Sequence, residues 1–371
     1  MTRSTETETE SLPRHTARSV EDLRRRGLLS EAEAVAAARV GERYAVAVTP
    51  EMAALVGEGG YDDPVGRQFL PHPAELESRP EEMADPIGDD PFTPVKGITH
   101  RYPDRVLLKP VHVCPVYCRF CFRREKVGPG GEALTAAELE AALDYVRRHP
   151  GVWEVILSGG DPMVLSPRRL RDIVGALDAI PHVASVRLHT RVPVVDPGRV
   201  SAALVAALRA ARETAVWVVL HVNHPREMTP EARSACARLV DGGIPMLSQS
   251  VLLAGVNDDA DTLAELFRTL VGQRIKPYYL HHPDLARGTS HFRVTLEAGR
   301  ALLSRLRGRV SGLCQPTYVL DLPGGHGKVP VGPPYAEPDQ ETGSWTIQDP
   351  WGSRHIYPPT PDSAQDPEDS R

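Results

Sequence analysis

Three of the five cysteines in this chain of 371 residues stand within a short segment, at Cys114, Cys118 and Cys121. Clustered thiols in such a cysteine-poor chain are typical of a metal site rather than of a disulfide framework. Structural zinc takes four protein ligands, whereas three thiolates on a four-iron cluster leave one iron open to another molecule. The spacing C-x3-C-x2-C therefore favours an iron–sulfur cluster, and a zinc site completed by a distant His, by Cys236 or by Cys314 remains the alternative.

Two glycine-rich segments end in residues that could bind a ligand. "LSGGD", which includes Ser158, Gly159, Gly160 and Asp161, follows a predicted strand, and its paired glycines leave the backbone exposed for a close approach. "DLPGGHGK" places Lys328 directly after a run of glycines. Taken alone, each segment also fits an ordinary turn.

The middle of the chain alternates short apolar runs with longer amphipathic ones. Six runs predict strands, at 105–113, 152–160, 184–192, 215–223, 245–253 and 275–282. Five amphipathic runs predict the helices between them, at 135–150, 166–180, 200–213, 229–243 and 259–273. This order predicts an α/β fold with a parallel sheet, either open or closed into a barrel, whose ligands lie at the strand ends.

The flanking segments differ from this middle part. Residues 1–18 are rich in Thr, Glu and Ser and are expected to be disordered. Residues 19–98 are expected to form an extension that begins with a helix capped by Ser19 or Ser30 and continues as irregular Pro-rich chain. The barrel and its site should occupy 99–332. The remaining 333–371 read as an irregular Pro-rich C-terminal extension with one hairpin within 344–357 and a disordered end.

Composition limits the partners of the chain. The net charge of −6 and the pI of about 6.2 provide no general attraction to nucleic acid or to anionic lipid. No apolar run reaches the roughly 20 residues of a membrane span, and the N-terminus lacks the apolar core of a secretory signal. We therefore expect a cytoplasmic protein that acts on a small molecule.

The cysteine spacing, with Phe120 just before the last cysteine, resembles the signature of the radical S-adenosylmethionine superfamily, and "LSGGD" resembles its Gly-Gly motif. The resemblance implies a partial (β/α)6 barrel in which Cys114, Cys118 and Cys121 hold a 4Fe-4S cluster. Its open iron would chelate the methionine end of S-adenosylmethionine. The residues expected to contact that cofactor are Ser158, Gly159, Gly160, Asp161, Arg191 and Gln249.

A closer resemblance extends from about residue 30 to about 335. "THRYPDRVLL", "CRFCFRRE", "HVNHPREMTPEA", "PYYLHHPDLARGTSHFR" and "PTYVLDLPGGHGKVPV" resemble segments of the lysine 2,3-aminomutase family, whose members also use pyridoxal phosphate. The resemblance implies that Lys328 forms the Schiff base with that cofactor. Arg101, Tyr102 and Arg105 would surround the cofactor phosphate, an anion that arginine binds well.

The resemblance also suggests a substrate and a reaction. Arg123 would bind the substrate carboxylate, and Asp284 and Asp321 the ε-ammonium of L-lysine, since two buried acids without a cation would be costly. A 5′-deoxyadenosyl radical would start the move of nitrogen from C2 to C3, giving β-lysine (3,6-diaminohexanoate). Arginine or a protein-bound lysine is an alternative substrate. A non-catalytic iron–sulfur or zinc module with a redox or sensing role is the alternative class of protein.

The sequence departs from clostridial members of that family near the "GVND" turn. Asp259 follows this turn where those members have a zinc-binding cysteine, and no cysteine lies beyond Cys314. We therefore expect no structural zinc, and a homo-oligomer in which the segment 345–357 could replace the metal-bound contact. His281 occupies a strand end where clostridial members have tyrosine. Flavodoxin or ferredoxin is the expected electron donor.

Overall fold

The computed structural model describes residues 15–56, 59–130 and 133–358. Within these ranges, nine strands form one sheet in which neighbours in sequence are neighbours in space. They are β1 (Ile98–Tyr102), β2 (Arg105–Val111), β3 (Glu154–Gly159), β4 (Ser185–Thr190), β5 (Ala215–His221), β6 (Met246–Val251), β7 (Ile275–His281), β8 (Thr317–Leu322) and β9 (Gly327–Pro330). Strands β2 to β8 run parallel, whereas β1 and β9 lie antiparallel at the two edges.

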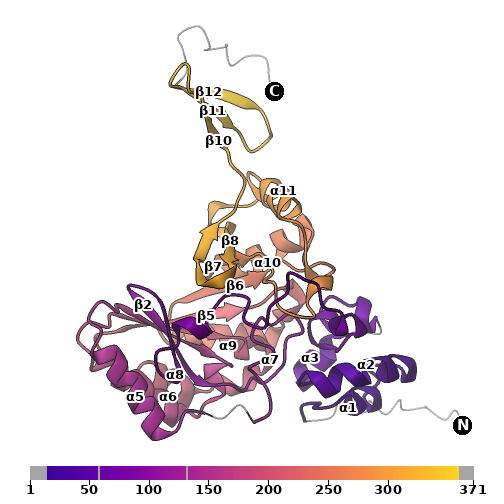
Figure 1. The fold of residues 1–371 in the computed structure, drawn as a ribbon, viewed down its shortest axis with the longest axis vertical. Coiled ribbons are helices and arrows are strands. Elements are labelled where there is room, and N and C mark those ends of the chain that lie inside the picture. The colour runs from indigo at the N-terminus through magenta and orange to yellow at the C-terminus, as the bar shows by residue number, and fades with distance from the viewer. Residues whose placement is uncertain (1–14, 57–58, 131–132, 359–371) are drawn as a thin grey trace, which may run out of the picture.

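Helices connect the parallel strands and cover the outer face of the sheet (Figure 1). They are α5 (Ala136–Arg147), α6 (Pro167–Asp178), α7 (Val192–Val195), α8 (Ala202–Leu208), α9 (Pro230–Asp241), α10 (Ala260–Gly272) and α11 (Leu296–Leu306). Except for the short α7, each begins at a Ser, Thr or Asp whose side chain accepts a hydrogen bond from the first turn. The predicted partial barrel is confirmed, with one parallel strand more than the six expected.

Strand alternation separates an apolar outer face from a polar inner face. Leu108, Leu157 and Leu188 are aligned on β2, β3 and β4 and pack into the core beneath the helices. The opposite face carries polar side chains toward the carboxyl ends of the strands, because successive residues point to opposite sides. These are Lys109, Ser158, His189, His221, Gln249, His281 and Asp321. The barrel interior is therefore built for polar ligands.

The N-terminal extension contains two helices where the sequence predicted one. Ser19 caps α1 (Val20–Arg25) and Ser30 caps α2 (Glu31–Arg43), and Gly27 at a φ of 69° separates them. The stretch predicted to be irregular contains α3 (Pro50–Leu55) and the short α4 (Gly66–Phe69). Ala17 is buried and pairs with Val48, so ordered chain begins before residue 19. Residues 1–14, predicted to be disordered, lie outside the described residues.

A buried ion pair ties this extension to the cysteine segment. Glu75, in the 3-10 turn Pro73–Leu76, accepts hydrogen bonds from Arg119 at 2.6 to 3.1 Å and also contacts Arg124. Arg119 stands between two of the cysteines and is only 2% exposed. Because an uncompensated buried charge is strongly unfavourable, the three side chains fix the cysteine segment against the extension.

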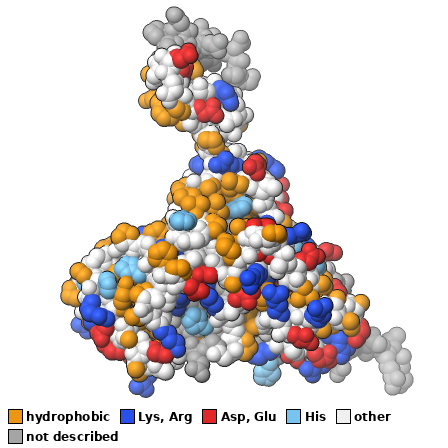
Figure 2. Space-filling model, viewed as in Figure 1, with side chains coloured by type: hydrophobic (Ala, Val, Ile, Leu, Met, Phe, Trp, Pro, Cys, Tyr) orange, Lys and Arg blue, Asp and Glu red, His pale blue; other side chains and the backbone are white. Residues whose placement is uncertain are grey.

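The C-terminal extension forms a small sheet that stands away from the barrel (Figure 1). The predicted hairpin is confirmed as β11 (Trp345–Gln348) and β12 (Arg354–Tyr357), and β10 (Ala336–Pro338) adds a third strand. Figure 2 shows this sheet as a lobe on a narrow neck. The predicted disordered end falls on residues 359–371, outside the described part. Among the described helices, none has the length and apolar character needed to cross a membrane.

Candidate active site

The three clustered cysteines face one small cavity at the carboxyl end of β2. Cys114, Cys118 and Cys121 line a space of about 50 Å³ together with side chains of the extension such as Tyr44. Burial raises the pKa of the Cys114 thiol well above its usual value, and the Asp161 carboxylate and the other two cysteines act in the same direction. Burial and Cys118 raise the pKa of Cys121 to about 11. The thiols thus influence one another electrostatically.

Arg191, at the end of β4, holds the middle cysteine. Its Nη1 donates a hydrogen bond to Cys118 Sγ at 2.9 Å, and its Nη2 donates to Gln68 Oε1 at 2.5 Å and Glu227 Oε2 at 2.6 Å. Gln68 and Glu227 are fully buried, and Asn223 also donates to Gln68. The network holds the Arg191 guanidinium against the Cys118 sulfur. It places Arg191 at the cluster site, and its contact with S-adenosylmethionine remains a prediction.

The cysteine arrangement fits an iron–sulfur cluster. Among the described residues, no three His, Cys, Asp or Glu side chains converge closely enough for one metal ion. Thiolates that bind three different irons of one cluster need not converge in this way. Cys236 and Cys314, the suggested fourth ligands of a zinc site, lie in the main core in α9 and in the 3-10 turn Gly312–Cys314. The absence of structural zinc stays a prediction.

Gly159 and Gly160 of the Gly-Gly motif lie so close to the backbone of a neighbouring segment that a larger residue would not fit. A Cβ on Gly160 would lie 2.4 Å from the Val113 carbonyl oxygen, and one on Gly159 would lie 2.7 Å from that of Val111. The φ of Gly159 is 98°, which disfavours other residues. This close packing lies where β3 meets the start of the cysteine segment. Both glycines are partly exposed, and the expectation that their backbone meets a ligand stays a prediction.

We expect Gly160→Ala to destabilise the protein, because the added methyl group collides with backbone rather than with a flexible side chain. The free energy of unfolding should fall by about 1–3 kcal/mol in chemical denaturation, and cluster content should fall with it. Gly175→Ala is the matched control, since Gly175 lies on the exposed face of α6 and no atom lies within 4 Å of its added Cβ. That control should gain about 0.4–1 kcal/mol. Equal losses in both variants would contradict the packing argument.

The other residues predicted for the adenosylmethionine site lie at the same strand ends. Asp161 is buried and accepts hydrogen bonds from Thr190 Oγ1 at 2.7 and 3.0 Å and from the Arg191 N–H at 2.7 Å, so it links β3 to β4. Gln249 Nε2 lies 3.4 Å from His189 Nδ1 on the inner face. Asp161 is satisfied by the protein itself and acts as a structural link, while Ser158 and Gln249 face the barrel interior.

A second centre surrounds Lys328 on β9. Its ammonium contacts Asp321 on the adjacent strand β8, and its backbone N–H donates to the Tyr102 hydroxyl at 2.8 Å. Arg101 Nη2 lies 3.7 Å from Asp321 Oδ1, and Arg105 lies over the Tyr102 ring at 3.8 Å. The structure thus brings together the four residues predicted for pyridoxal phosphate. Asp321, one of the acids predicted for the substrate, contacts Lys328 and lies near Arg101.

Asp284 completes an acidic pair with Asp321. Burial, followed by the charge of Asp321, raises the pKa of Asp284 to about 7, while Lys328, Arg123 and Arg101 oppose that shift. These five ionisable groups therefore share one electrostatic environment, although they come from widely separated parts of the chain. Arg123, Asp284 and Asp321, which were predicted to bind the substrate, thus act on the same electrostatic environment as Lys328, the lysine predicted to bind the aldehyde.

Arg123 has partners that sequence reasoning missed. Its Nε and Nη2 donate to Asp89 Oδ2 at 3.1 and 2.9 Å, and its Nη1 donates to Ser158 Oγ at 3.3 Å. Burial alone would raise the pKa of Asp89, but the charge and hydrogen bonds of Arg123 bring it below its usual value. Asp89 lies in the Pro-rich extension, where no pattern marked it. Lys109 was also not predicted as a site residue, although the sequence shows it as a charged residue inside an apolar strand.

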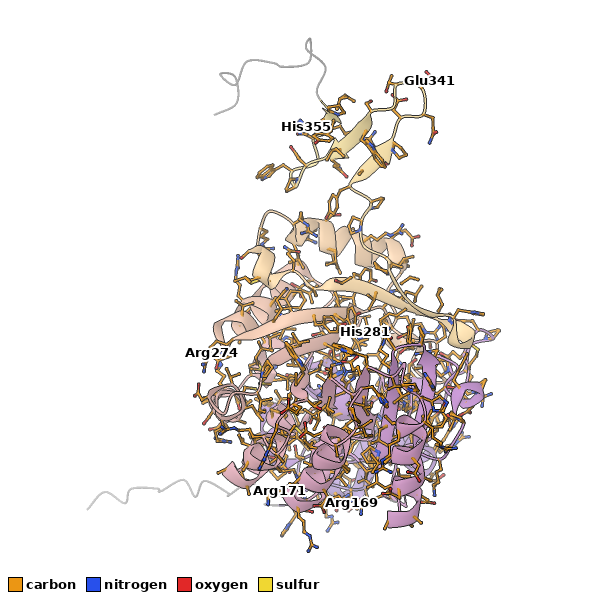
Figure 3. All side chains as sticks on the ribbon, turned by 90° about the vertical axis from the view of Figure 1, so that its left-hand side faces the viewer. Arg169, Arg171, Arg274, His281, Glu341 and His355 are labelled. Carbon is orange, nitrogen blue, oxygen red and sulfur yellow. The ribbon has the colours of Figure 1, made fainter. Side chains whose placement is uncertain are left out.

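Three half-buried histidines line the inner face beside these centres: His189, His221 and His281. Burial is the main cause that lowers their pKa values well below the usual range, so their imidazoles are neutral. The charge of Lys328 also lowers the pKa of His281. Figure 3 shows His281 inside the body of the molecule. Whether it contacts a ligand or only packs stays a prediction.

The fold and the cysteine site together define a class of enzyme. The family model described as the radical SAM superfamily matches residues 108–267, which span the cysteines and the strands β3 to β6. Members of this superfamily use a 4Fe-4S cluster with S-adenosylmethionine. The three cysteines on one cavity, with Arg191 bound to Cys118, fit that cluster.

The chain belongs to the L-lysine 2,3-aminomutase family, and it is an enzyme of the aminomutase type. It is 40% identical to L-lysine 2,3-aminomutase of Fusobacterium nucleatum, over 85% of this chain and 74% of that protein. It is 41% identical to that of Clostridium subterminale, over 87% and 77%. It is also 35% identical to glutamate 2,3-aminomutase of Clostridioides difficile, over 80% and 69%. Because relatives named for lysine and for glutamate both match, the identity of the substrate depends on the residues of the active site.

Proposed function

We propose that this protein is a pyridoxal phosphate-dependent mutase that converts L-lysine to β-lysine by moving the amino group from C2 to C3. The observation that carries this proposal is the distribution of charge in the barrel. Arg123 lies at the β2–β3 side, and Asp284 and Asp321 lie at the β7–β8 side. A carboxylate at one end and an alkylammonium at the other match these two groups.

The surroundings of Lys328 support the pyridoxal phosphate part of the proposal. Arg101 Nε and Asp321 Oδ1 are buried without a hydrogen-bond partner, so the site retains unused polar capacity. Arg101 and Arg105 could hold a phosphate, and Lys328 could attach the aldehyde covalently. When bound, pyridoxal phosphate supplies the π-system through which the nitrogen migrates. The protein residues orient the substrate and keep water from the reacting atoms.

The ion pair of Lys328 supports a cationic substrate. The Lys328 ammonium that contacts Asp321 is a primary alkylammonium, the same group that ends the side chain of lysine. If Lys328 held the cofactor, its ammonium would no longer occupy Asp321, and this acid would be available to bind a substrate cation. Glutamate, with a second carboxylate, would meet repulsion from Asp284 and Asp321. Arginine remains the closest competitor because its guanidinium would also satisfy this pair.

We expect the affinity for lysine to rise with pH across neutrality. With a pKa of about 7, Asp284 is mostly protonated below pH 7 and mostly anionic above it. Its ionised fraction should rise from about a tenth at pH 6 to about nine-tenths at pH 8, so KM for L-lysine should fall up to about tenfold. Steady-state kinetics across this range measure the effect.

Asp284→Asn is the control for this pH dependence. The variant should bind lysine about 10- to 150-fold more weakly, because it loses one hydrogen bond to a charged group, and its KM should be nearly flat from pH 6 to 8. A wild-type KM that rises with pH, or a variant that keeps the full dependence, would contradict the role of Asp284.

We further propose that the C-terminal sheet contacts another copy of the chain. None of the strand residues of this sheet is buried, and Trp351 and Tyr357 are 83% and 64% exposed, so the sheet presents apolar side chains that a second copy would cover. Sedimentation of the full chain beside a Trp351→Ser variant tests this, and an unchanged mass would contradict it. Flavodoxin or ferredoxin as reductant stays a prediction.

A further inference from the structure

Lys109 is a buried lysine on the inner face of β2. It is only 8% exposed, and its neighbour Leu108 packs outward into the core, so alternation directs Lys109 to the barrel interior. Its backbone N–H donates to the Gly97 carbonyl at 2.7 Å. Within the described ranges, its ammonium makes no hydrogen bond or ion pair with another side chain. An ammonium on an almost wholly buried side chain, with no carboxylate bound to it, is suited to an anionic ligand.

The surroundings of Lys109 carry a surplus of positive charge. Arg123 and Asp89 act on it more strongly than any other ionisable groups. Arg123 uses one edge of its guanidinium for Asp89 Oδ2 and its Nη1 for Ser158. Asp89 Oδ1 is buried and has no hydrogen-bond partner. Two cations and one carboxylate leave one positive charge, which one carboxylate of a ligand would neutralise.

We propose that Lys109 and Arg123 together bind the substrate carboxylate, that Asp89 holds Arg123 in position, and that the substrate is therefore a free amino acid. This inference rests on the proposed function and narrows it. The carbonyl group of a lysine inside a peptide is uncharged, and it would leave that one positive charge uncompensated. Lys109 is a specificity-determining residue in this assignment, and Asp89 is a positioning residue.

The geometry of Arg123 explains why a second cation is needed. Arginine commonly binds a carboxylate through two parallel N–H donors, but here Nε and Nη2 already bind Asp89. Only Nη1 remains directed at Ser158 and the barrel interior. Lys109 lies beside the same strand end, since a Cβ on Gly159 would approach its Cβ to 3.0 Å. It supplies the donors that Arg123 no longer offers.

The test compares ligands that differ only in the carboxylate. Calorimetry on the anaerobically reconstituted holoenzyme, with no reductant, gives dissociation constants for L-lysine, L-lysinamide, L-norleucine and L-norleucinamide. In Lys109→Met the preference for each acid over its amide should fall about tenfold or more, with amide binding unchanged. Lys126→Met is the matched control, because Lys126 pairs with Asp90 at the surface and its loss should leave the preference intact.

Several results would overturn the proposal. Equal weakening of acids and amides in Lys109→Met, or an unchanged preference, would remove Lys109 from the carboxylate site. S-adenosylmethionine also carries a carboxylate, so weaker binding of that cofactor with an unchanged lysine preference would assign Lys109 to it instead. Lys109→Gln, checked by iron content and melting temperature, repeats the test if the Met variant does not fold.

The design also separates this inference from the proposed function. One distinguishing result is a wild type that discriminates acids from amides on both side chains yet binds lysine no better than norleucine. That result would contradict lysine as the substrate and would still support the carboxylate site. Conversely, a wild type that prefers lysine to norleucine but does not distinguish acid from amide would overturn only the role of Lys109.

Discussion

Replacing Cys118 with alanine is expected to remove the iron–sulfur cluster and with it all detectable aminomutase turnover. Cys118 is the cysteine whose sulfur accepts a hydrogen bond from Arg191, within a buried network that includes Glu227. Without the thiolate one iron loses its ligand, and Arg191 loses an acceptor. Iron per chain after anaerobic reconstitution should fall from about four to below one. Iron and sulfide analysis, with the visible absorbance of the cluster, measures this loss.

Cys236→Ala provides the control for that experiment. Cys236 lies in α9 within the main core, where burial raises the pKa of its thiol to about 12, so it remains a neutral packing residue. Its loss should cost some stability and leave the iron content unchanged. A Cys118→Ala protein that keeps four irons, or a Cys236→Ala protein that loses them, would contradict the assigned ligands.

Replacing Lys328 with alanine should abolish covalent attachment of pyridoxal phosphate and reduce turnover by about 10³-fold or more, as expected for loss of a reacting group. Lys328 is the lysine that follows the glycine turn and lies against Asp321 and Tyr102. Borohydride reduction of the loaded wild type should fix the cofactor on the peptide that contains Lys328, as read by mass spectrometry. The variant should show no such label.

Lys276→Ala serves as the matched control, because Lys276 also lies on a strand of the sheet but hydrogen-bonds the carbonyls of Pro277 and Gln315. It should keep the label on Lys328. A reduced label on another lysine, or a Lys328→Ala variant that still fixes the cofactor, would show that the pyridoxal assignment is wrong.

Much of the site was predictable because several of its residues occur in short segments with a recognisable pattern. The cysteines occur within one segment, and Lys328 follows a glycine run, so both are visible without knowledge of the fold. The resemblance to a family supplied Arg123, Asp284 and Asp321, which lie far apart in the sequence. The structure brings these acids and Lys328 into one electrostatic environment.

Other features depend on tertiary contacts and were not predictable. Asp89 looked like one acid among several in a Pro-rich stretch, and only the fold places it on Arg123. The Gly-Gly motif predicted a close approach of a ligand, and only the fold shows that Gly160 also packs against the backbone of Val113. Strands β8 and β9 were missed as strands because the "VLDLPGGHGKVP" segment was interpreted as a motif. A turn with glycines at positive φ joins them.

The most direct measurement is turnover of L-lysine by the anaerobically reconstituted enzyme with pyridoxal phosphate, S-adenosylmethionine and a reductant. The account predicts β-lysine as the product. L-Glutamate should be turned over far more slowly because Asp284 and Asp321 would repel its second carboxylate, and L-arginine should be the nearest competitor. Formation of no β-amino acid from lysine, together with turnover of arginine or glutamate, would contradict it.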